Sequence, residues 1–205
     1  MHQIDDDPAW REYLARVVDH MPRFACGGLE QASIVVLELW HRGDDGFRLA
    51  AALKRRRNPP RLLALTSRCD EVALYRSMLG PLEGVVWKTP AAQGQLCEGL
   101  EALLADRSYF PPEVVAERRR VCASPDAYFK RLSPVELELM PYLGQFTSDF
   151  EIARQTGRSP ATIRWHRGEI IRRLDLHDSF ELVRWAMETG FVAPNLPAPP
   201  CLVGV

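Results

Sequence analysis

The sequence predicts an α/β domain with a parallel sheet, followed by an all-α domain that contains a helix-turn-helix. Three observations indicate this fold class. In the first half of the 205-residue chain, short apolar runs alternate with helical patterns, which is typical of a parallel sheet covered on both faces. The second half has helical periodicity. Within it, residues 149–174 contain two helical patterns separated by a glycine, as in a helix-turn-helix.

The order of elements in the first domain follows from these runs. Strands are predicted at residues 1–4, 33–39, 61–66 and 84–87, and helices at residues 7–20, 47–56, 71–79 and 93–105. Residues 40–46 are rich in glycine and aspartate and are predicted to be a loop. The first strand is very short, and its outer edge needs cover, either from another protomer or from residues 24–28.

The second domain opens with a helix that has a clear start signal. Ser133 is predicted to cap it, Pro134 to take its first position, and Glu136 to complete a capping box. Pro141 is expected to bend this helix or to end it early, because a proline removes one backbone hydrogen bond.

The helix-turn-helix begins with a short helix. Asp149 is predicted to cap it, and Phe150, Ile152 and Ala153 are predicted to form its inward face. Gly157 supplies the tolerant backbone at which this helix must stop.

The second helix of the motif starts at Ser159 and Pro160, where an N-cap serine and a first-turn proline are favoured. Its apolar face consists of Ile163, Ile170, Ile171 and Leu174. The other face can meet phosphates and base edges in a major groove, and it carries Thr162, Arg164, Trp165, His166, Arg167 and Arg172. By periodicity alone, a helical hairpin with a solvated arginine face is an equal alternative.

Composition restricts the mode of any nucleic-acid binding. The formal net charge is −1, whereas nonspecific binding depends on neutralising many phosphates. The carboxy-terminal domain is also balanced between arginines and carboxylates. We therefore expect weak binding by a monomer, and binding by a homodimer to paired half-sites of double-stranded DNA.

Other classes of protein lack support in the sequence. The five cysteines are scattered without metal-binding spacing, so we expect reduced thiols, no metal and no cofactor. The residue spacings of Ser/His/Asp or Cys/His catalysis and the glycine-rich phosphate loop are not evident, so an enzyme is not expected. The sequence contains neither an apolar run of membrane-spanning length nor a signal-peptide pattern at residue 1, so we expect a cytoplasmic protein without membrane contact.

The second domain resembles the four-helix DNA-binding domain of LuxR/NarL-type regulators. The motifs RLSPVELEL (131–139), EIAR (151–154) and SPATI (159–163), with His166, Arg173 and Leu174, follow the spacing of that family across residues 130–192. The resemblance implies a dimer contact through the last helix, residues 179–189. It also implies DNA contacts from Ser159, Thr162, Arg164, Trp165 and Arg167.

The first domain resembles a response-regulator receiver, which is a flavodoxin-like α/β fold. The resemblance assigns Asp5 and Asp6 to the acidic metal-binding pair, Thr66 to the hydroxyl position and Lys88 to the invariant lysine. The phosphorylated aspartate is replaced by Glu38. A receiver needs its acceptor carboxylate at a fixed reach from Mg²⁺, so the extra methylene predicts a degenerate pocket. An ion pair between Glu38 and Lys88 could hold this pocket in one state without a kinase.

The receiver resemblance has two further departures. Val85 stands where many receivers have an aromatic switch residue. Too few residues separate Asp6 from Glu38 for the usual helix, strand, helix and strand, so we expect an incomplete parallel sheet that lacks one βα unit.

These observations predict a degenerate receiver-like domain at residues 1–107, a linker at 108–129, a LuxR-type helix-turn-helix domain at 130–193 and a flexible tail at 194–205. The favoured function is a homodimeric transcription regulator that binds DNA without phosphorylation and recruits or excludes RNA polymerase. One alternative is a protein-interaction regulator that binds the polymerase or another regulator, and the salt dependence of DNA binding separates the two. The other alternative is a conventional phosphorylated response regulator.

Overall fold

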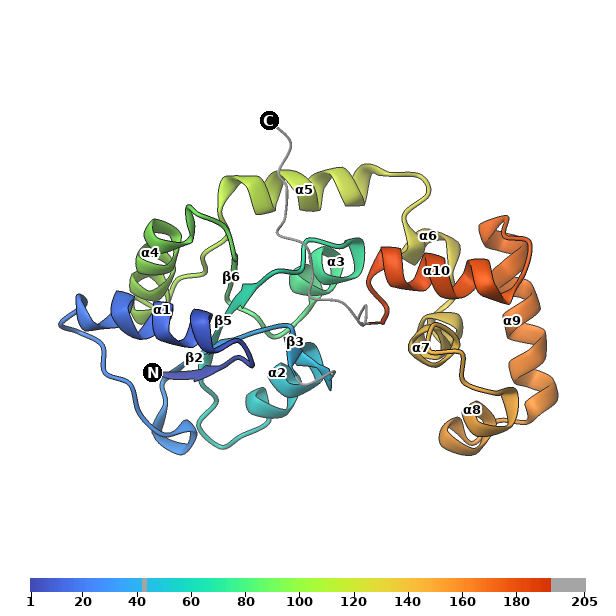
Figure 1. Cartoon of the computed structure of the whole chain (residues 1–205), viewed down its shortest axis with the longest axis horizontal. Helices are drawn as coiled ribbons and strands as arrows, with labels where there is room; N and C mark the ends of the chain where they lie inside the picture. The colour runs from blue at the N-terminus through green and yellow to red at the C-terminus, as the bar shows by residue number, and fades with distance from the viewer. Residues whose placement is uncertain (42–43, 193–205) are drawn as a thin grey trace. The chain divides into compact units, whose positions relative to one another are not determined.

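The computed structural model describes residues 1–41 and 44–192, and Figure 1 shows its elements. The chain divides into two compact units, which are described separately. The first contains residues 1–119 apart from 70–72, and the second contains residues 70–72 together with the described chain from Arg120 onward. The tail predicted at residues 194–205 lies outside the described residues.

The first unit is built on a four-stranded parallel sheet in the order β1-β2-β5-β6. Its strands are β1 (His2–Ile4), β2 (Ile34–Leu37), β5 (Arg61–Thr66) and β6 (Gly84–Trp87). Between Asp6 and Glu38 the chain forms helix α1 (Pro8–Asp19), a 3₁₀ turn (Leu29–Gln31) and β2. The second strand and second helix expected of a receiver are replaced by this turn and its flanking loop, which agrees with the predicted incomplete sheet.

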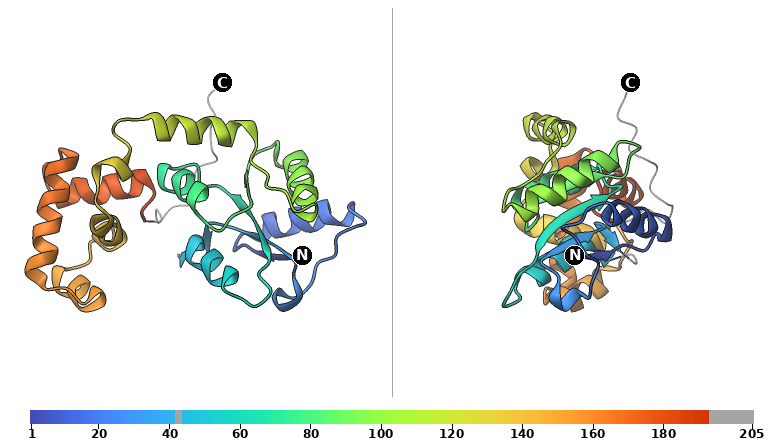
Figure 2. Two further views of the ribbon diagram at one scale, coloured as in Figure 1. Left: turned by 180° about the vertical axis from the view of Figure 1, so that it is seen from behind. Right: turned by 90° about the vertical axis from the view of Figure 1, so that its left-hand side faces the viewer.

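Helices cover both faces of this sheet (Figures 1 and 2). α1 and α4 (Ala92–Leu104) pack on one face, and their buried leucines and valines meet alternate residues of the strands, including Val36, Leu63 and Val86. The intervening strand residues are also buried and point to the opposite face, because side chains alternate along a strand. Helices α2 (Gly46–Lys54) and α3 (Glu71–Leu79) lie on that side.

The outer edge of β1 is covered by the chain itself, at least near the start of the strand. The Met1 carbonyl accepts from the Gly27 amide at 2.9 Å, and the Met1 amino group donates to the Ala25 carbonyl at 2.7 Å. His2 Nδ1 lies 2.9 Å from the Gly27 carbonyl oxygen. Of the two predicted covers, residues 24–28 are therefore the one seen in the structure.

Part of the segment predicted as a loop at residues 40–46 forms strands. β3 (Trp40–His41) and β4 (Asp44–Asp45) pair antiparallel, and the next helix starts at Gly46. A Cβ at Gly46 would lie 2.6 Å from the Glu38 carbonyl oxygen and 2.7 Å from Leu39 Cα. The glycine therefore lets the start of α2 pack directly against the backbone that carries Glu38.

The residues predicted as a linker contain regular structure. The Tyr109 carbonyl accepts from the Val85 amide at 3.2 Å, so the chain returns to the edge of β6 before it enters α5 (Pro112–Ala123). Helix α6 (Tyr128–Arg131) follows.

The second unit continues with α7 (Pro134–Leu143), α8 (Asp149–Thr156), α9 (Pro160–Leu174) and α10 (Ser179–Thr189). Their shared core includes Leu139, Ile152, Ile163, Ile170 and Leu182. The predicted capping box at Ser133 and Glu136 is present, and α7 extends only two residues beyond Pro141.

Two predictions about α8 are wrong. Its N-cap is Ser148, whose hydroxyl accepts from the Glu151 amide, and Asp149 is the first helical residue. Phe150 points outward and its side chain is 72% exposed, whereas Ile152 and Ala153 are buried as predicted. Residues two apart lie on opposite sides of a helix, so Phe150 and Ile152 cannot both face the core.

Candidate nucleic-acid interface and acidic pocket

The turn between α8 and α9 fixes where the second helix starts. Gly157 takes the left-handed conformation with φ of 69°, which ends α8 as predicted. Ser159 is the N-cap of α9, and its Oγ accepts from the Thr162 amide at 3.1 Å. Ser159 Oγ also lies 2.8 Å from Thr162 Oγ1, so the two hydroxyls form one polar group at the start of the helix.

The outward face of α9 is exposed beside this group. The side chain of Arg164 is 73% exposed, and Trp165 is 59% exposed. Arg172 is also exposed and pairs with Glu169 at 2.8 Å on the same helix. Thr162, Arg164 and Trp165 can therefore reach a ligand without any rearrangement of the core.

Arg167 differs from the other predicted contact residues because it is bound within the domain. Its Nη2 donates to Asp149 Oδ1 at 2.7 Å and to the Thr147 carbonyl at 3.1 Å, and its Nε donates to the same carboxylate oxygen at 3.1 Å. Both side chains are 17% exposed. Fewer arginines of this face are therefore available for a ligand than the sequence suggested, since Arg167 holds the start of α8 against α9.

Asp149 also influences Arg164. Its Oδ2 lies 3.5 Å from Arg164 Nε, while its Oδ1 accepts from Arg167. One partly buried carboxylate thus neutralises part of the positive charge on α9 and restrains the exposed guanidinium. This contact was not predicted from the sequence, because Asp149 was interpreted as a helix cap.

A second ion pair stabilises the position of α9. The carboxylate of Glu136 is buried and accepts from the Ser133 amide at 2.7 Å and from Arg173 Nη1 at 2.7 Å. This contact joins the start of α7 to the end of α9. The capping box was predictable from the sequence, whereas the partner on α9 was not.

His166 was predicted on the face that meets DNA, but in the structure it is only partly exposed. Its ring contacts the Trp165 ring edge to face at 4.8 Å between centroids, and its Nδ1 is buried with no hydrogen-bond partner among the described residues. It is therefore poorly placed to read a base.

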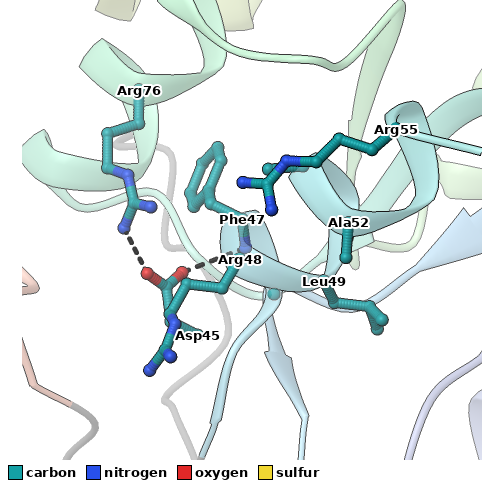
Figure 3. Close-up of a pocket in the computed structure, with 9 residues that line it drawn as sticks. Asp45, Phe47, Arg48, Leu49, Ala52, Arg55 and Arg76 are labelled. Atoms are coloured by element: carbon teal, nitrogen blue, oxygen red, sulfur yellow. Dashed lines mark hydrogen bonds and ion pairs between the residues drawn. The ribbon is translucent and has the colours of Figure 1, made fainter.

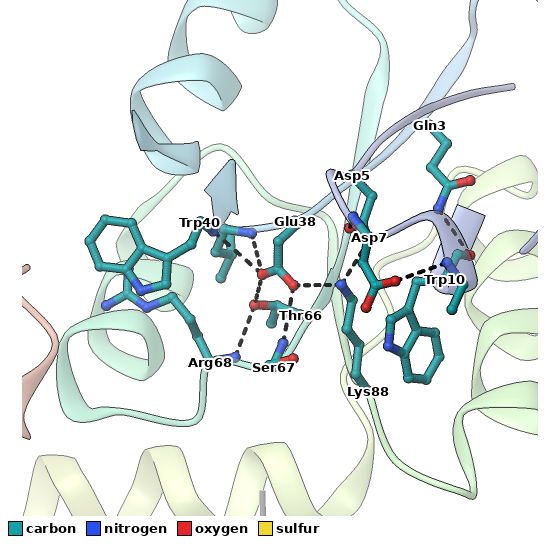
Figure 4. Close-up of polar contacts among 12 residues, drawn as sticks. Gln3, Asp5, Asp7, Trp10, Glu38, Trp40, Thr66, Ser67, Arg68 and Lys88 are labelled. Carbon is teal, nitrogen blue, oxygen red and sulfur yellow. Dashed lines mark hydrogen bonds and ion pairs between the residues drawn. The ribbon is translucent and has the colours of Figure 1, made fainter. Parts of the chain in front are cut away.

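In the first unit, four of the five predicted pocket residues meet at the carboxyl ends of the strands (Figure 4). Both oxygens of Glu38 accept hydrogen bonds. Oε1 accepts from the Leu39 amide at 2.7 Å, from the Trp40 amide at 3.4 Å and from the hydroxyl of Thr66. Oε2 lies 2.8 Å from Lys88 Nζ and accepts from the Ser67 amide at 3.3 Å.

Lys88 joins the two carboxylates of the pocket. Its Nζ lies 2.7 Å from Asp5 Oδ2 in addition to its contact with Glu38, and the three side chains are each at least 91% buried. Burial lowers the pKa of Lys88, but the charge of Glu38 and the hydrogen bonds to both carboxylates outweigh it and raise the pKa. Burial raises the pKa of Asp5, and Lys88 offsets this only in part because it is shared with Glu38.

These residues do not fit the Mg²⁺ ion that a receiver fold implies. The ammonium of Lys88 already lies between the carboxylates of Asp5 and Glu38, where a bridging cation would have to bind. Asp5 Oδ1 accepts from the Asp7 amide at 2.9 Å, and Asp6 is exposed. In residues 1–41 and 44–192, no group of three or more His, Cys, Asp or Glu side chains is arranged to hold a metal.

The fold and the family match of the second domain together define a class of protein. In this class, a receiver-like α/β domain is followed by a LuxR-type helix-turn-helix domain. Residues 130–186 match the family model "Bacterial regulatory proteins, luxR family". The response regulator protein VraR of Staphylococcus aureus (strain Mu3 / ATCC 700698) is 21% identical over 159 residues, which cover 78% of this chain and 76% of VraR.

Solved structures show the same fold. RcsB from Salmonella enterica serovar Typhimurium, bound to promoter P1flhDC in the presence of the phosphomimetic BeF₃⁻, aligns with a TM-score of 0.61 at 22% identity and covers 92% of this chain and 97% of RcsB. A complex of the two-component response regulator RcsB with DNA aligns with a TM-score of 0.59 at 21% identity, over 92% and 97% of the two chains. Among the described helices, none has the length and apolar character needed to span a membrane.

Proposed function

We propose that this chain is a DNA-binding transcription regulator of the LuxR/NarL type that acts as a homodimer and does not require phosphorylation. The observation that carries the proposal is the Glu38 network. Three groups that could receive a phosphoryl oxygen at this position, the Thr66 hydroxyl, the Ser67 amide and the Lys88 ammonium, are already bound to the carboxylate of Glu38. The side chain thus supplies the negative charge that a kinase would otherwise add.

Electrostatics supports the same proposal. Asp5, Glu38 and Lys88 together carry one net negative charge in a buried site. Phosphorylation of Glu38 would break its contact with Lys88 and would add further negative charge to this buried site. Because buried charge without a partner is costly, the reaction is disfavoured.

For DNA recognition, we propose that α9 enters the major groove. Arg164 and Thr162 would contact base edges, Trp165 would contact a thymine methyl or a sugar, and Ser159 would lie near a phosphate. Arg167 would act mainly as a positioning residue through Asp149, although its Nη1 could still approach the DNA. Support comes from the exposure of this face, from the family match at residues 130–186 and from the DNA complexes of RcsB.

We further propose the domain division predicted from the sequence, with residues 108–129 joining a receiver-like domain at 1–107 to the output domain at 130–193. A homodimer would present two α9 helices to the half-sites of a two-fold operator. The balanced charge of the output domain supports this, since one copy makes too few phosphate contacts for tight binding. Phe180 of α10, which is 73% exposed, is available for the dimer contact.

The phosphorylation part of the proposal is tested with acetyl phosphate and Mg²⁺. The full chain is incubated with this donor, and the intact mass is measured, together with that of an Asp45→Asn variant. We expect no stoichiometric acyl phosphate on either protein. A stoichiometric aspartyl phosphate, at Asp44 or Asp45 for example, would contradict the proposal. Absence of this phosphate in the Asp45→Asn variant would identify Asp45 as the modified residue.

The role of Ser159 is tested by replacing it with aspartate. Aspartate caps helices as well as serine does, so Ser159→Asp should keep the stability of the domain, whereas Ser159→Ala should lose about 1 kcal/mol. Near a phosphate the added negative charge should weaken DNA binding. The measurements are urea unfolding and DNA binding for both variants. Unchanged DNA affinity in Ser159→Asp would remove Ser159 from the interface.

A further inference from the structure

A cleft on the first unit has no role in the function proposed above. It has a volume of about 670 Å³, is open to solvent and is lined by α2 with its two flanking residues, Asp45 and Arg55, and by Arg76 of α3. Small-molecule sites usually have volumes of roughly 300–1,000 Å³, so its size is suited to a metabolite. Figure 3 shows that Arg55 and Arg76 lie on either side of the Phe47 ring, with Asp45 below them.

The lining of this cleft is strongly positive in a chain of net charge −1. Its charged residues are Asp45 and three arginines, Arg48, Arg55 and Arg76. Asp45 accepts from the Phe47 amide at 3.0 Å and pairs with Arg76 at 2.7 Å. The single carboxylate is therefore used by the protein, and two positive charges remain in the cleft.

The other two arginines are available for a ligand. In the part of the chain that the structure describes, neither Arg48 nor Arg55 forms an ion pair or a side-chain hydrogen bond, and both are exposed. Arg48 lies in α2 and Arg55 caps its end, seven residues or about two helical turns later, so they project from similar faces of the helix. Between them, Ala51 and Ala52 are small and leave the space open.

The third arginine is held in place by the fold. The guanidinium of Arg76 lies 4.3 Å from the centroid of the Phe47 ring, and Phe47 itself is buried. Stacking and the ion pair with Asp45 fix the direction of its remaining donors. The cleft thus combines the fixed guanidinium of Arg76 with the two exposed guanidinium groups of Arg48 and Arg55. Such a set suits phosphate or carboxylate oxygens, which arginine can bind through two parallel hydrogen bonds.

From this geometry we infer that the cleft binds a small molecule with two anionic groups, either phosphates or carboxylates. The two unpaired arginines provide the charge for such a dianion, and Arg76 orients one of its groups. The site is linked to the acidic pocket, because the Gly46 amide at the edge of the cleft donates to the Leu39 carbonyl at 2.8 Å and Leu39 follows Glu38. The inference does not depend on DNA binding.

The test uses the full chain and two probes, inorganic pyrophosphate for the phosphate class and succinate for the carboxylate class. Binding is measured by isothermal titration calorimetry at constant ionic strength. At least one probe should bind at a single saturable site, and Arg48→Ala combined with Arg55→Ala should weaken it by at least about tenfold. The probe that binds more tightly identifies the class of anion.

A matched control distinguishes binding in the cleft from nonspecific attraction of the anion to positive surface charge. Arg11→Ala combined with Arg57→Ala also removes two exposed arginines, but neither residue lines the cleft. This variant should bind the probe within about twofold of the unaltered protein, and circular dichroism confirms that both variants are folded. The inference is overturned if neither probe shows saturable binding, or if the control variant loses as much affinity as the cleft variant.

Discussion

Replacing Lys88 by methionine is expected to lower the free energy of unfolding of the receiver-like domain by about 3–5 kcal/mol. The substitution keeps the approximate length of the side chain but removes the ammonium that lies 2.7 Å from Asp5 and 2.8 Å from Glu38. Two carboxylates would then remain buried without a cation. Urea unfolding followed by circular dichroism measures the change.

A second variant distinguishes lost charge pairing from simple misfolding. Asp5→Asn and Glu38→Gln, added to Lys88→Met, neutralise the whole cluster and should restore a large part of the lost stability, because buried ion pairs can often be replaced by neutral groups. If the triple variant is as unstable as Lys88→Met alone, the unpaired carboxylates are not the cause. Since the pKa of Lys88 is raised in the fold, its contribution is present at neutral pH and is lost only when alkaline pH deprotonates it.

The second large effect concerns the two arginines of α9, which the structure places in different environments. Arg164→Ala should weaken DNA binding by about 1–3 kcal/mol and relax the preference at one base pair, as expected for a base-reading side chain. Arg167→Ala should destabilise the output domain, because it removes a partly buried partner of Asp149. Its effect on DNA affinity should be similar for every sequence.

The measurement is a set of binding isotherms on the operator and on single base-pair variants, with unfolding curves for each protein. Arg57→Ala serves as a control that removes one exposed charge far from α9 in sequence. If Arg164→Ala leaves both affinity and base preference unchanged, α9 does not read DNA through this residue. If Arg167→Ala alters base preference while the domain keeps its stability, Arg167 is itself a reading residue.

Much of this fold was predictable because its signals are local. Helix starts at Ser133 and Ser159, the helix end at Gly157 and the short branched strands each depend on a few neighbouring residues. The pairing of Glu38 with Lys88 was also anticipated, because the resemblance to a receiver assigns both residues to one pocket.

The missed features depend on contacts between distant residues. Arg167 was predicted to be free for DNA, but its partner Asp149 lies 18 residues earlier and was interpreted as a cap. The contact between Glu136 and Arg173 spans 37 residues. The arginine cleft gave no sequence signal, since Arg76 comes from a different helix than Arg48 and Arg55.

Footprinting of the purified, unphosphorylated protein on its own upstream region tests the central claim most directly. The experiment is done at two salt concentrations, with and without acetyl phosphate and Mg²⁺. We predict protection of a two-fold site without the donor, weaker protection at the higher salt concentration because phosphate contacts are screened, and no change when the donor is added. Protection that appears only after the donor is added would contradict the account.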